Sequence, residues 1–261
     1  GRLYEESMAL LEEAGIKIPG GKRTLLVPAR NFPVEVLFLR DDDIPESVAS
    51  GVADVGIVGL NEVMEKRCPV GILKKLGFGK CRLSLAIPQN IDYQDRNWFS
   101  GKKIATSYPG ILSDYLHKNG IVSDIHVITG SVEIAPGIRL ADAIFDIVSS
   151  GSTLVSNRLK EVETVVESEA VLIGTDSISP EKRGILDELL FRFDSVQAAD
   201  DKKYILMNVP QKKLNDVLSV LPGIKSPTVM PLADKEWCSV HTVLDEKCFW
   251  EIINRLKTAG A

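Results

Sequence analysis

Residues 143–154 read AIFDIVSSGSTL and contain the sharpest local pattern of the chain. The first six are apolar and β-rich apart from one aspartate, which is typical of a buried strand. Five small residues follow before a helix can begin, and they are Ser149, Ser150, Gly151, Ser152 and Thr153. Such a loop predicts an anion site, because free backbone N–H groups and the helix dipole face the ligand. The alternative is an ordinary polar turn, since most helix N-termini bind only water.

Three carboxylates lie close to this loop in the sequence. Asp142 and Asp146 are four residues apart, so a strand would present both on one face. Glu133 lies upstream of them. A carboxylate beside a phosphate loop is poorly placed to bind phosphate, but it can accept hydrogen bonds from sugar hydroxyls or bind Mg²⁺. The pattern is equally consistent with a solvated strand end.

Strand and helix patterns alternate on both sides of the loop, which is typical of an α/β sheet. β-Rich runs predict strands over residues 34–39, 55–58, 81–87, 103–106, 126–129, 162–166 and 170–173. Helical spacing and capping residues predict helices over residues 2–14, 109–119 and 179–196, with a short helix starting near Pro45.

The C-terminal part has a different order of elements. Its pattern predicts strand 203–209, helix 212–221 ended by Pro222-Gly223, strands 228–232 and 238–244, and helix 246–259. One more strand would complete a β-α-β-β-α-β ferredoxin-like unit. The chain ends at Ala261, where we expect that strand to begin.

Composition argues against several classes of protein. The 261 residues are 44% hydrophobic, enough for one large domain or for two to three small ones. A net charge of −5 disfavours nucleic-acid binding, which needs a basic face. No apolar run approaches the ~20 residues of a membrane span, and no signal peptide is visible. We therefore expect neither a nucleic acid nor a membrane as a partner.

The four cysteines and three histidines fit neither a zinc site nor a disulfide framework by their spacing. The expectation is four reduced thiols in a cytoplasmic protein. The sequence has no H-E-x-x-H motif and no G-x-S-x-G nucleophile elbow. Covalent catalysis and a catalytic zinc are therefore disfavoured.

The motifs around the loop resemble those of one enzyme family. Glu133, the runs 140–144 and 146–148, and Gly151-x-Thr153-Leu154 closely resemble the signature of ATP phosphoribosyltransferases. Further runs resemble the same family in its order, at residues 40–45, 54–57, 81–86, 103–109 and 226–228. The resemblance covers essentially the whole chain, and its motifs are specific.

The resemblance implies a fold of the α/β class. Two α/β lobes, like those of periplasmic binding proteins, would face each other across a cleft, followed by a C-terminal ferredoxin-like (ACT-like) α+β domain. Residues 1–80 and 155–198 would form lobe I of the catalytic region, and residues 81–154 lobe II with the phosphoribosyl-pyrophosphate loop. Residues 199–261 would form the regulatory domain of the long form of the enzyme, without its last strand.

The resemblance also implies a reaction, the first step of histidine biosynthesis. N1 of ATP would displace pyrophosphate from C1′ of phosphoribosyl pyrophosphate with Mg²⁺, and histidine would inhibit. Positive charge develops on the ribose as pyrophosphate leaves, so the enzyme must hold two charged substrates in line and stabilise the departing anion. No protein nucleophile is required. A cytoplasmic homo-oligomer, dimer and hexamer, is implied as well.

Roles of single residues follow from the same motifs. The loop from Ser149 to Thr153 would hold the 5-phosphate, and Asp146 and Glu133 would hold the ribose hydroxyls. The residues implied for ATP are Arg2, Asp54 and Tyr108, and those implied for the inhibitor histidine are Thr228 and Leu232. The metal ligands are not assigned.

The sequence departs from the family pattern in three places. Arg139 stands where the family usually has glycine, which would strain Arg139 by about 1–2 kcal/mol if the position has φ > 0. Leu60 stands where many members have glutamate after Gly59, so a carboxylate of the cleft is missing. Third, we expect a strand and a basic residue before Gly1 and a strand after Ala261. A fragment lacking both strands is expected to be unstable and nearly inactive, because their sheet neighbours would lose backbone partners.

Two other functions use the same architecture. A solute-binding or effector-sensing protein could have the two-lobed fold without catalysis. A regulatory paralogue could bind histidine after losing activity, an interpretation that Arg139 and Leu60 keep open. The hydroxyl-rich loop with its upstream carboxylates favours the enzyme.

Overall fold

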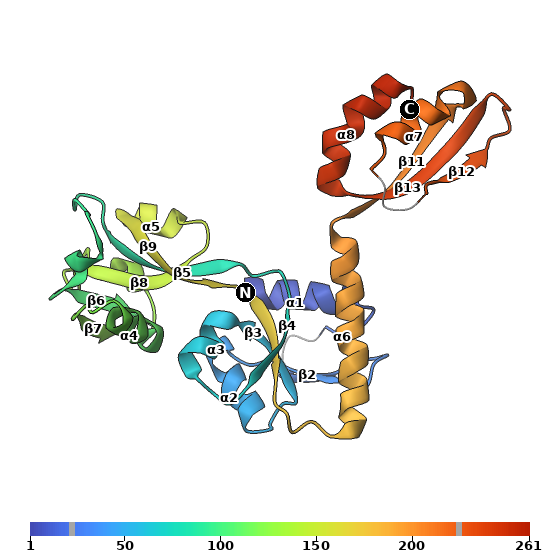
Figure 1. Cartoon of the computed structure of the whole chain (residues 1–261). Coiled ribbons are helices and arrows are strands. Elements are labelled where there is room, and N and C mark those ends of the chain that lie inside the picture. The colour runs from blue at the N-terminus through green and yellow to red at the C-terminus, as the bar shows by residue number, and fades with distance from the viewer. Residues whose placement is uncertain (21–23, 223–225) are drawn as a thin grey trace. The chain divides into compact units, whose positions relative to one another are not determined.

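The polypeptide divides into two units, Gly1–Leu190 and Phe191–Ala261. The computed structural model describes residues 1–20, 24–222 and 226–261. Helix α6 (Pro180–Asp200) contains the division between the units. Among the described residues, the first unit holds a two-stranded hairpin and two larger sheets, and the second unit holds one further sheet (Figure 1). In the described part of the chain, none of the helices combines the length and apolarity that a bilayer crossing requires.

The first sheet is small and antiparallel, with the order β3-β10-β4. Its strands are β3 (Val55–Gly59), β4 (Gly71–Lys75) and β10 (Ala170–Gly174). The surrounding elements are α1 (Arg2–Glu13), the hairpin strands β1 (Leu26–Pro28) and β2 (Glu35–Leu37), α2 (Ile44–Ala49) and α3 (Leu60–Lys66). Helix α2 packs so closely on β3 that a Cβ at Gly56 would lie 2.6 Å from Ile44 Cγ2. We call this part lobe I.

The second sheet is mixed, with the order β7-β6-β8-β5-β9. Its strands are β5 (Cys81–Pro88), β6 (Lys103–Thr106), β7 (Asp124–Val127), β8 (Ala143–Val148) and β9 (Leu159–Ser168). Strand β6 is parallel to both β7 and β8, whereas β5 is antiparallel to β8 and β9. The associated helices are α4 (Pro109–Lys118) and α5 (Ser152–Ser156). We call this part lobe II.

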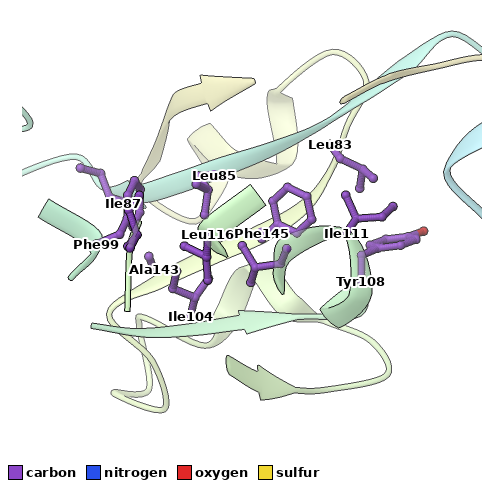
Figure 2. Packing of buried hydrophobic residues seen from close by; sticks show 12 residues of the cluster. Leu83, Leu85, Ile87, Phe99, Ile104, Tyr108, Ile111, Leu116, Ala143 and Phe145 are labelled. Atoms are coloured by element: carbon purple, nitrogen blue, oxygen red, sulfur yellow. The ribbon is translucent and has the colours of Figure 1, made fainter. Parts of the chain in front are cut away.

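Both faces of the lobe II sheet are covered, which explains why the residues of β5 from Leu83 to Ile87 are all buried. On one face, Leu83, Leu85 and Phe145 are fully buried in a cluster with residues of α4 (Figure 2). On the other face, Ala86, Ile144, Val148, Leu154 and Leu159 form a second cluster, to which α5 contributes Leu154. Tyr108 lies at the edge of the first cluster, with its hydroxyl oxygen directed away from the other labelled side chains (Figure 2).

Strand pairing places the end of lobe II later in the chain than the sequence predicts. Residues 155–198 were expected in lobe I, but β9 pairs with β5 along its length and therefore belongs to lobe II. The chain returns to lobe I only at β10, which pairs with β3 and β4. The physical reason is that β9 completes the sheet beside β5, so its charged residues occupy a strand rather than a connection.

The second unit contains the expected order of strands and helices. Its elements are β11 (Lys202–Pro210), α7 (Leu214–Val220), β12 (Thr228–Pro231), β13 (Trp237–Asp245) and α8 (Glu246–Ala259). The order β11-β13-β12, antiparallel throughout, is that of three strands of a ferredoxin-like sheet. The helices bury Val217, Ile252 and Leu256 against Val209 and Val240. The sequence predicts that Pro222-Gly223 ends the helix before it. Gly223 lies outside the described residues.

Short 3₁₀ turns connect several elements. They are η1 (Asp41–Asp43), η2 (Arg96–Phe99), η3 (Val132–Ile134) and η4 (Gln211–Lys213). One of them bears on the site described next, because η3 contains Glu133 and precedes β8 in lobe II.

Candidate active site

The hydroxyl-rich loop connects β8 to α5, as the sequence pattern predicts. Gly151 has φ of 81° and lies at the N-cap of α5, a left-handed conformation that favours glycine. The hydroxyls of Ser150 and Ser152 are 3.0 Å apart, and Ser152 N donates to Ser150 Oγ at 3.4 Å. Four of the five residues, Ser149, Ser150, Ser152 and Thr153, are exposed. The loop therefore presents hydroxyls and backbone N–H groups at the end of a buried strand.

Asp146 lies two residues before Val148, the last residue of β8, and its carboxylate accepts from Ile147 N at 2.8 Å. Burial raises the pKa of Asp146 to about 6; the Ile147 N–H opposes this shift and the charge of Glu133 adds to it. Glu133 is on η3, so the structure brings the two carboxylates implied for the ribose close enough to interact. Each would hold a hydroxyl as an acceptor while ionised.

Asp142 does not join this pair, although it is four residues from Asp146. Its carboxylate accepts from Lys103 N at 2.9 Å at the beginning of β6, and the residue is exposed. Four residues of strand span about 13 Å. Asp142 therefore fixes the opposite end of the sheet rather than the loop.

Tyr108 links this group to lobe I. It precedes α4 and is 8% exposed, and its hydroxyl donates to Glu62 Oε1 at 2.9 Å. The same hydroxyl accepts from Asn61 Nδ2 at 3.2 Å. Burial raises the pKa of Tyr108, the charge of Glu62 raises it further, and the charge of Asp146 contributes. The hydroxyl is therefore neutral, and it lies within electrostatic reach of the Asp146 carboxylate.

Helix α3 of lobe I contacts α4 of lobe II at further points. The carboxylate of Glu65 accepts from the backbone N–H groups of Gly110 and Ile111, at 2.8 and 2.9 Å. Arg67 Nη2 contacts Asp114 Oδ2 at 2.7 Å. A carboxylate at the first turn of a helix offsets the positive end of its dipole. These bonds fix the position of Tyr108 relative to α3.

Asp54 is not brought to this group of residues. It precedes β3, and its carboxylate accepts from Lys182 Nζ at 2.8 and 3.0 Å. Glu62 follows the opposite end of β3, and the strand's five residues span about 16 Å. Asp54 thus pairs with α6, away from Tyr108 and Asp146.

Arg2 begins α1 and pairs with Glu6 at 3.2 Å. Burial raises the pKa of the Cys81 thiol, while a hydrogen bond with Ser168 and the charge of Arg2 oppose that shift. Arg2 therefore lies near the start of β5, where the chain passes from one lobe to the other. Its charge contributes to the pKa of Cys81 and is not among the causes of the pKa shift of Asp146.

The two departures within the chain have clear structural positions. Arg139 has φ of 59°, so it occupies a left-handed conformation that a glycine would adopt without strain. Leu60 is the first residue of α3, after Gly59. Two residues further on, Glu62 supplies a carboxylate beside Tyr108, and burial raises the pKa of this carboxylate, while the hydrogen bond from Tyr108 opposes the shift.

Sequence reasoning missed four residues of the site. Asn61 and Glu62 follow the conspicuous Gly59-Leu60 position but carry no motif of their own. Arg82 and Glu161 form a bidentate ion pair beside the loop, and Arg82 Nη1 donates to Ser149 O at 3.2 Å. Arg82 stands within one of the recognised runs, whereas Glu161 lies in the charged sequence KEVET, which resembles a solvated surface.

The residues implied for histidine binding are in the second unit. Thr228 begins β12 and is exposed, and its strand partner is His241 of β13. Leu232 follows β12 and is half-buried, with its backbone N–H donating to Trp237 O at 3.2 Å. On the same sheet, His241 contacts the hydroxyls of Tyr204 and Ser239.

Among the described residues, there is no group of three or more histidine, cysteine, aspartate or glutamate side chains able to hold a metal ion. The pair Asp146 and Glu133 still fits Mg²⁺ in the manner this ion prefers. Mg²⁺ retains several waters and binds through one or two carboxylates together with substrate phosphates. A dedicated cage of protein ligands is not needed.

The fold places the chain among two-lobed α/β proteins of the periplasmic-binding-protein type. The substrate-binding protein of an amino acid ABC transporter matches with a TM-score of 0.51 and 11% identity, covering 76% of this chain and 81% of that one. The solved structure of an ATP phosphoribosyl transferase (HisG:HisZ) complex from Thermotoga maritima matches more closely. Its TM-score is 0.66 at 26% identity, covering 77% of this chain and 95% of that one.

Sequence comparison gives the family directly. The family model for ATP phosphoribosyltransferase matches residues 40–195, and the model for the HisG C-terminal domain matches residues 199–261. The ATP phosphoribosyltransferase of Bacteroides fragilis is 69% identical over all 261 residues, which cover 92% of its length. That of Cytophaga hutchinsonii is 57% identical over the same residues, covering 91% of its length. The chain belongs to the ATP phosphoribosyltransferase family, in its long form, and is a transferase of the first step of histidine biosynthesis.

Proposed function

We propose that the loop from Ser149 to Thr153 binds the 5-phosphate of phosphoribosyl pyrophosphate and that Asp146 and Glu133 hold its ribose hydroxyls. The observation that carries this proposal is the position of Asp146, two residues from the end of β8, just before the hydroxyl-rich loop. The loop donates and the carboxylates accept, which matches a ligand that is anionic at one end and hydroxylated at the other.

The chemistry needs positioning rather than a nucleophile from the protein. N1 of ATP attacks C1′ of the ribose, the bond from C1′ to the pyrophosphate oxygen breaks, and the electron pair leaves with pyrophosphate. Positive charge develops on the ribose ring in the transition state. Ionised Asp146 and Glu133, held at the ribose hydroxyls, favour that charge electrostatically and keep the ring in line for attack.

Mg²⁺ is the cofactor that we propose for this site. When bound, it would neutralise charge on the pyrophosphate group, and Asp146 and Glu133 are the side chains that would lie nearest to it. The two carboxylates would otherwise repel the diphosphate, and the raised pKa of Asp146 reflects the cost of ionising it beside Glu133 in a buried position.

For ATP, the residue best supported is Tyr108, whose hydroxyl lies between Glu62 and Asn61 at the contact of α3 and α4. Arg2, near the start of β5, is a second candidate through its charge. The ion pair of Asp54 with Lys182 supports a role in holding α6 instead. We therefore assign Asp54 a stabilising role and leave ATP to Tyr108 and Arg2.

Regulation by histidine and self-association complete the proposal. The ferredoxin-like unit supplies a second, separate sheet, and its β12 segment with Thr228 and Leu232 is where we place the inhibitor. The relative from Thermotoga maritima is a complex of subunits, which supports an oligomeric assembly, here a homo-oligomer acting in the cytoplasm.

One assay tests the proposed reaction. The full chain is incubated with ATP, phosphoribosyl pyrophosphate and Mg²⁺, and the absorbance of the N1-substituted adenine product is followed. We expect turnover that requires all three components and releases one pyrophosphate for each product formed. Binding of either substrate without any product would favour a solute-sensing protein of the same architecture.

A further inference from the structure

A guanidinium group meets a carboxylate beside the first residue of the phosphate loop. Arg82 Nε and Nη2 donate to the two carboxylate oxygens of Glu161, each at 2.5 Å. The third nitrogen, Nη1, donates to the backbone carbonyl of Ser149 at 3.2 Å. One side chain of β5 thereby joins a residue of β9 to the beginning of the loop.

The strand register puts these groups on one face of the sheet. Arg82 lies opposite Val148, the residue directly before the loop, and Ser84 lies opposite Asp146. Glu161 lies opposite Ala86, two positions further along the same face of β5. This is the face that α5 covers, so the ion pair, the loop and Asp146 share one side of lobe II.

Glu161 is held in place by further donors. Its Oε1 also accepts from Ser84 Oγ at 2.7 Å and from Thr164 Oγ1 at 3.1 Å. Ser84 is fully buried, so its hydroxyl is a fixed point. The hydrogen bonds from Arg82 lower the pKa of Glu161 to about 2, with Ser84 and Thr164 adding to the effect. Glu161 is therefore ionised at neutral pH and orients the guanidinium plane.

The carbonyl of Ser149 belongs to the peptide group whose N–H is that of Ser150. If this peptide rotated, its oxygen would face the bound anion and the N–H would face away, which loses a donor and adds repulsion. Other hydrogen bonds of the loop are local, such as Ser150 to Ser152 and Val155 N to Gly151 O. Arg82 adds a connection across 67 residues of sequence to the rigid sheet.

We propose that Arg82, oriented by Glu161, is a positioning residue for phosphoribosyl pyrophosphate, because it holds the Ser149–Ser150 peptide with its N–H available to the 5-phosphate. The proposal rests on the assignment of the loop as the phosphate site. Arg82 acts through the loop and need not touch the substrate. The geometry also requires arginine, since a lysine has one nitrogen and cannot bind Glu161 in bidentate fashion while donating to Ser149.

The test uses the full chain with Arg82→Met, Arg82→Lys, Glu161→Gln and the double variant Arg82→Met/Glu161→Gln. A loop fixed before binding lowers the KM for phosphoribosyl pyrophosphate without changing the chemical step. We therefore expect Arg82→Met to raise that KM about tenfold or more, with kcat changed less than about threefold and the KM for ATP unchanged. Arg82→Lys should behave like Arg82→Met, and the double variant should be no worse than Arg82→Met alone, because Glu161 acts only through Arg82.

The matched control is Arg96→Met, which removes another arginine of lobe II whose partners are Asn119, at 2.6 Å, and Glu163. It should leave both KM values unchanged. A second readout is independent of catalysis. The dissociation constant of ribose 5-phosphate, measured by calorimetry, should rise in Arg82→Met by the same factor as KM.

A loop variant, Ser152→Ala, separates the two claims. If Ser152→Ala raises the KM for phosphoribosyl pyrophosphate and Arg82→Met does not, the positioning role is contradicted while the phosphate loop stands. If neither variant changes the KM or the ribose 5-phosphate affinity, the loop assignment itself is contradicted. A fall in melting temperature with unchanged KM values in Arg82→Met would reduce the ion pair to a structural role.

Discussion

The hydroxyl of Tyr108 in lobe II donates a hydrogen bond of 2.9 Å to the carboxylate of Glu62 in lobe I. The two residues are 46 positions apart in the sequence. Both side chains are largely shielded from water, and this burial raises the pKa of each. The bond therefore connects the two lobes near the carboxylate of Asp146. The carboxylate of Glu62 lies two residues after Leu60, at the beginning of α3.

Tyr108→Phe tests this connection. The substitution removes the donor to Glu62 and the acceptor for Asn61 Nδ2, so we expect the free energy of unfolding of the chain to fall by about 1–2 kcal/mol. We also expect a higher KM for ATP. The measurements are urea denaturation and initial rates at varied ATP.

The control for this prediction is Tyr115→Phe, on the helix that Tyr108 precedes. The Tyr115 hydroxyl lies 3.4 Å from Glu163 Oε2, a weaker bond within lobe II. It should cost less stability and leave the KM for ATP unchanged. Equal losses in the two variants would show that the contact between the lobes contributes nothing specific.

Arg139 offers a test of backbone strain. Its φ of 59° favours glycine over residues with a Cβ by about 1–2 kcal/mol. We therefore expect Arg139→Gly to be more stable than Arg139→Ala by about 1 kcal/mol, compared by thermal melts of the two variants. At the exposed helical position Asp187 of α6, the order should reverse, because glycine costs about 1 kcal/mol relative to alanine in a helix. The same order at both positions would contradict a strained Arg139.

Histidine should inhibit the enzyme through the second unit. Thr228 begins a strand whose neighbour carries His241, in a sheet separate from the catalytic lobes. We expect millimolar or lower histidine to reduce turnover, and Thr228→Val to shift the inhibition curve to higher histidine. Coupling requires two distinct sites, so Thr228→Val should leave the turnover measured without histidine unchanged. Undiminished turnover at millimolar histidine would contradict the regulatory role of this unit.

The pH dependence of stability should reveal the cost of Asp146. Its pKa is raised from 3.8 to about 6 in the folded chain, so between these values the folded state binds more protons than the unfolded state. Stability from this group is therefore present below pH 3.8 and is lost as the pH rises through about 6. Asp146→Asn should raise the melting temperature at pH 7.5 relative to the parent chain, with a smaller difference at pH 4.5. A variant less stable than the parent at pH 7.5 would contradict the assigned shift.

Strand prediction from the sequence succeeds where a strand contains a run of buried apolar residues, and it fails where charged residues dominate a strand or its beginning. Strands β6 and β8 match the predicted residues 103–106 and 143–148, because each contains a run of buried apolar residues, Ile104-Ala105 in β6 and Ala143–Phe145 in β8. Strand β4 (Gly71–Lys75) was not predicted, since two of its five residues are lysines. Strand β9 extends three residues before its predicted start at 162, because Lys160 and Glu161 concealed it.

The residues of the candidate site also fall into two groups, those that the local sequence pattern predicts and those that it misses. Asp146 and the loop follow one another in sequence, so local pattern was sufficient to find them. The bonds of Tyr108 to Glu62 and of Arg82 to Glu161 join residues 46 and 79 positions apart. The first pairing depends on how the two lobes meet and the second on the register of β5 against β9, and hydrophobic periodicity specifies neither. Asp54 shows the converse, since its motif was recognised but its side chain pairs with Lys182.

The turnover of Asp146→Asn tests the central claim most directly. The substitution keeps the size of the side chain but removes the ionised acceptor from the ribose site. A lost interaction that strengthens in the transition state costs about 2.7 kcal/mol or more, so kcat should fall at least about 100-fold with the fold intact by circular dichroism. Asp142→Asn, at the other end of β8, is the matched control and should retain nearly normal turnover. Near-normal activity in Asp146→Asn would remove Asp146 from the active site and contradict the placement of phosphoribosyl pyrophosphate at the end of β8.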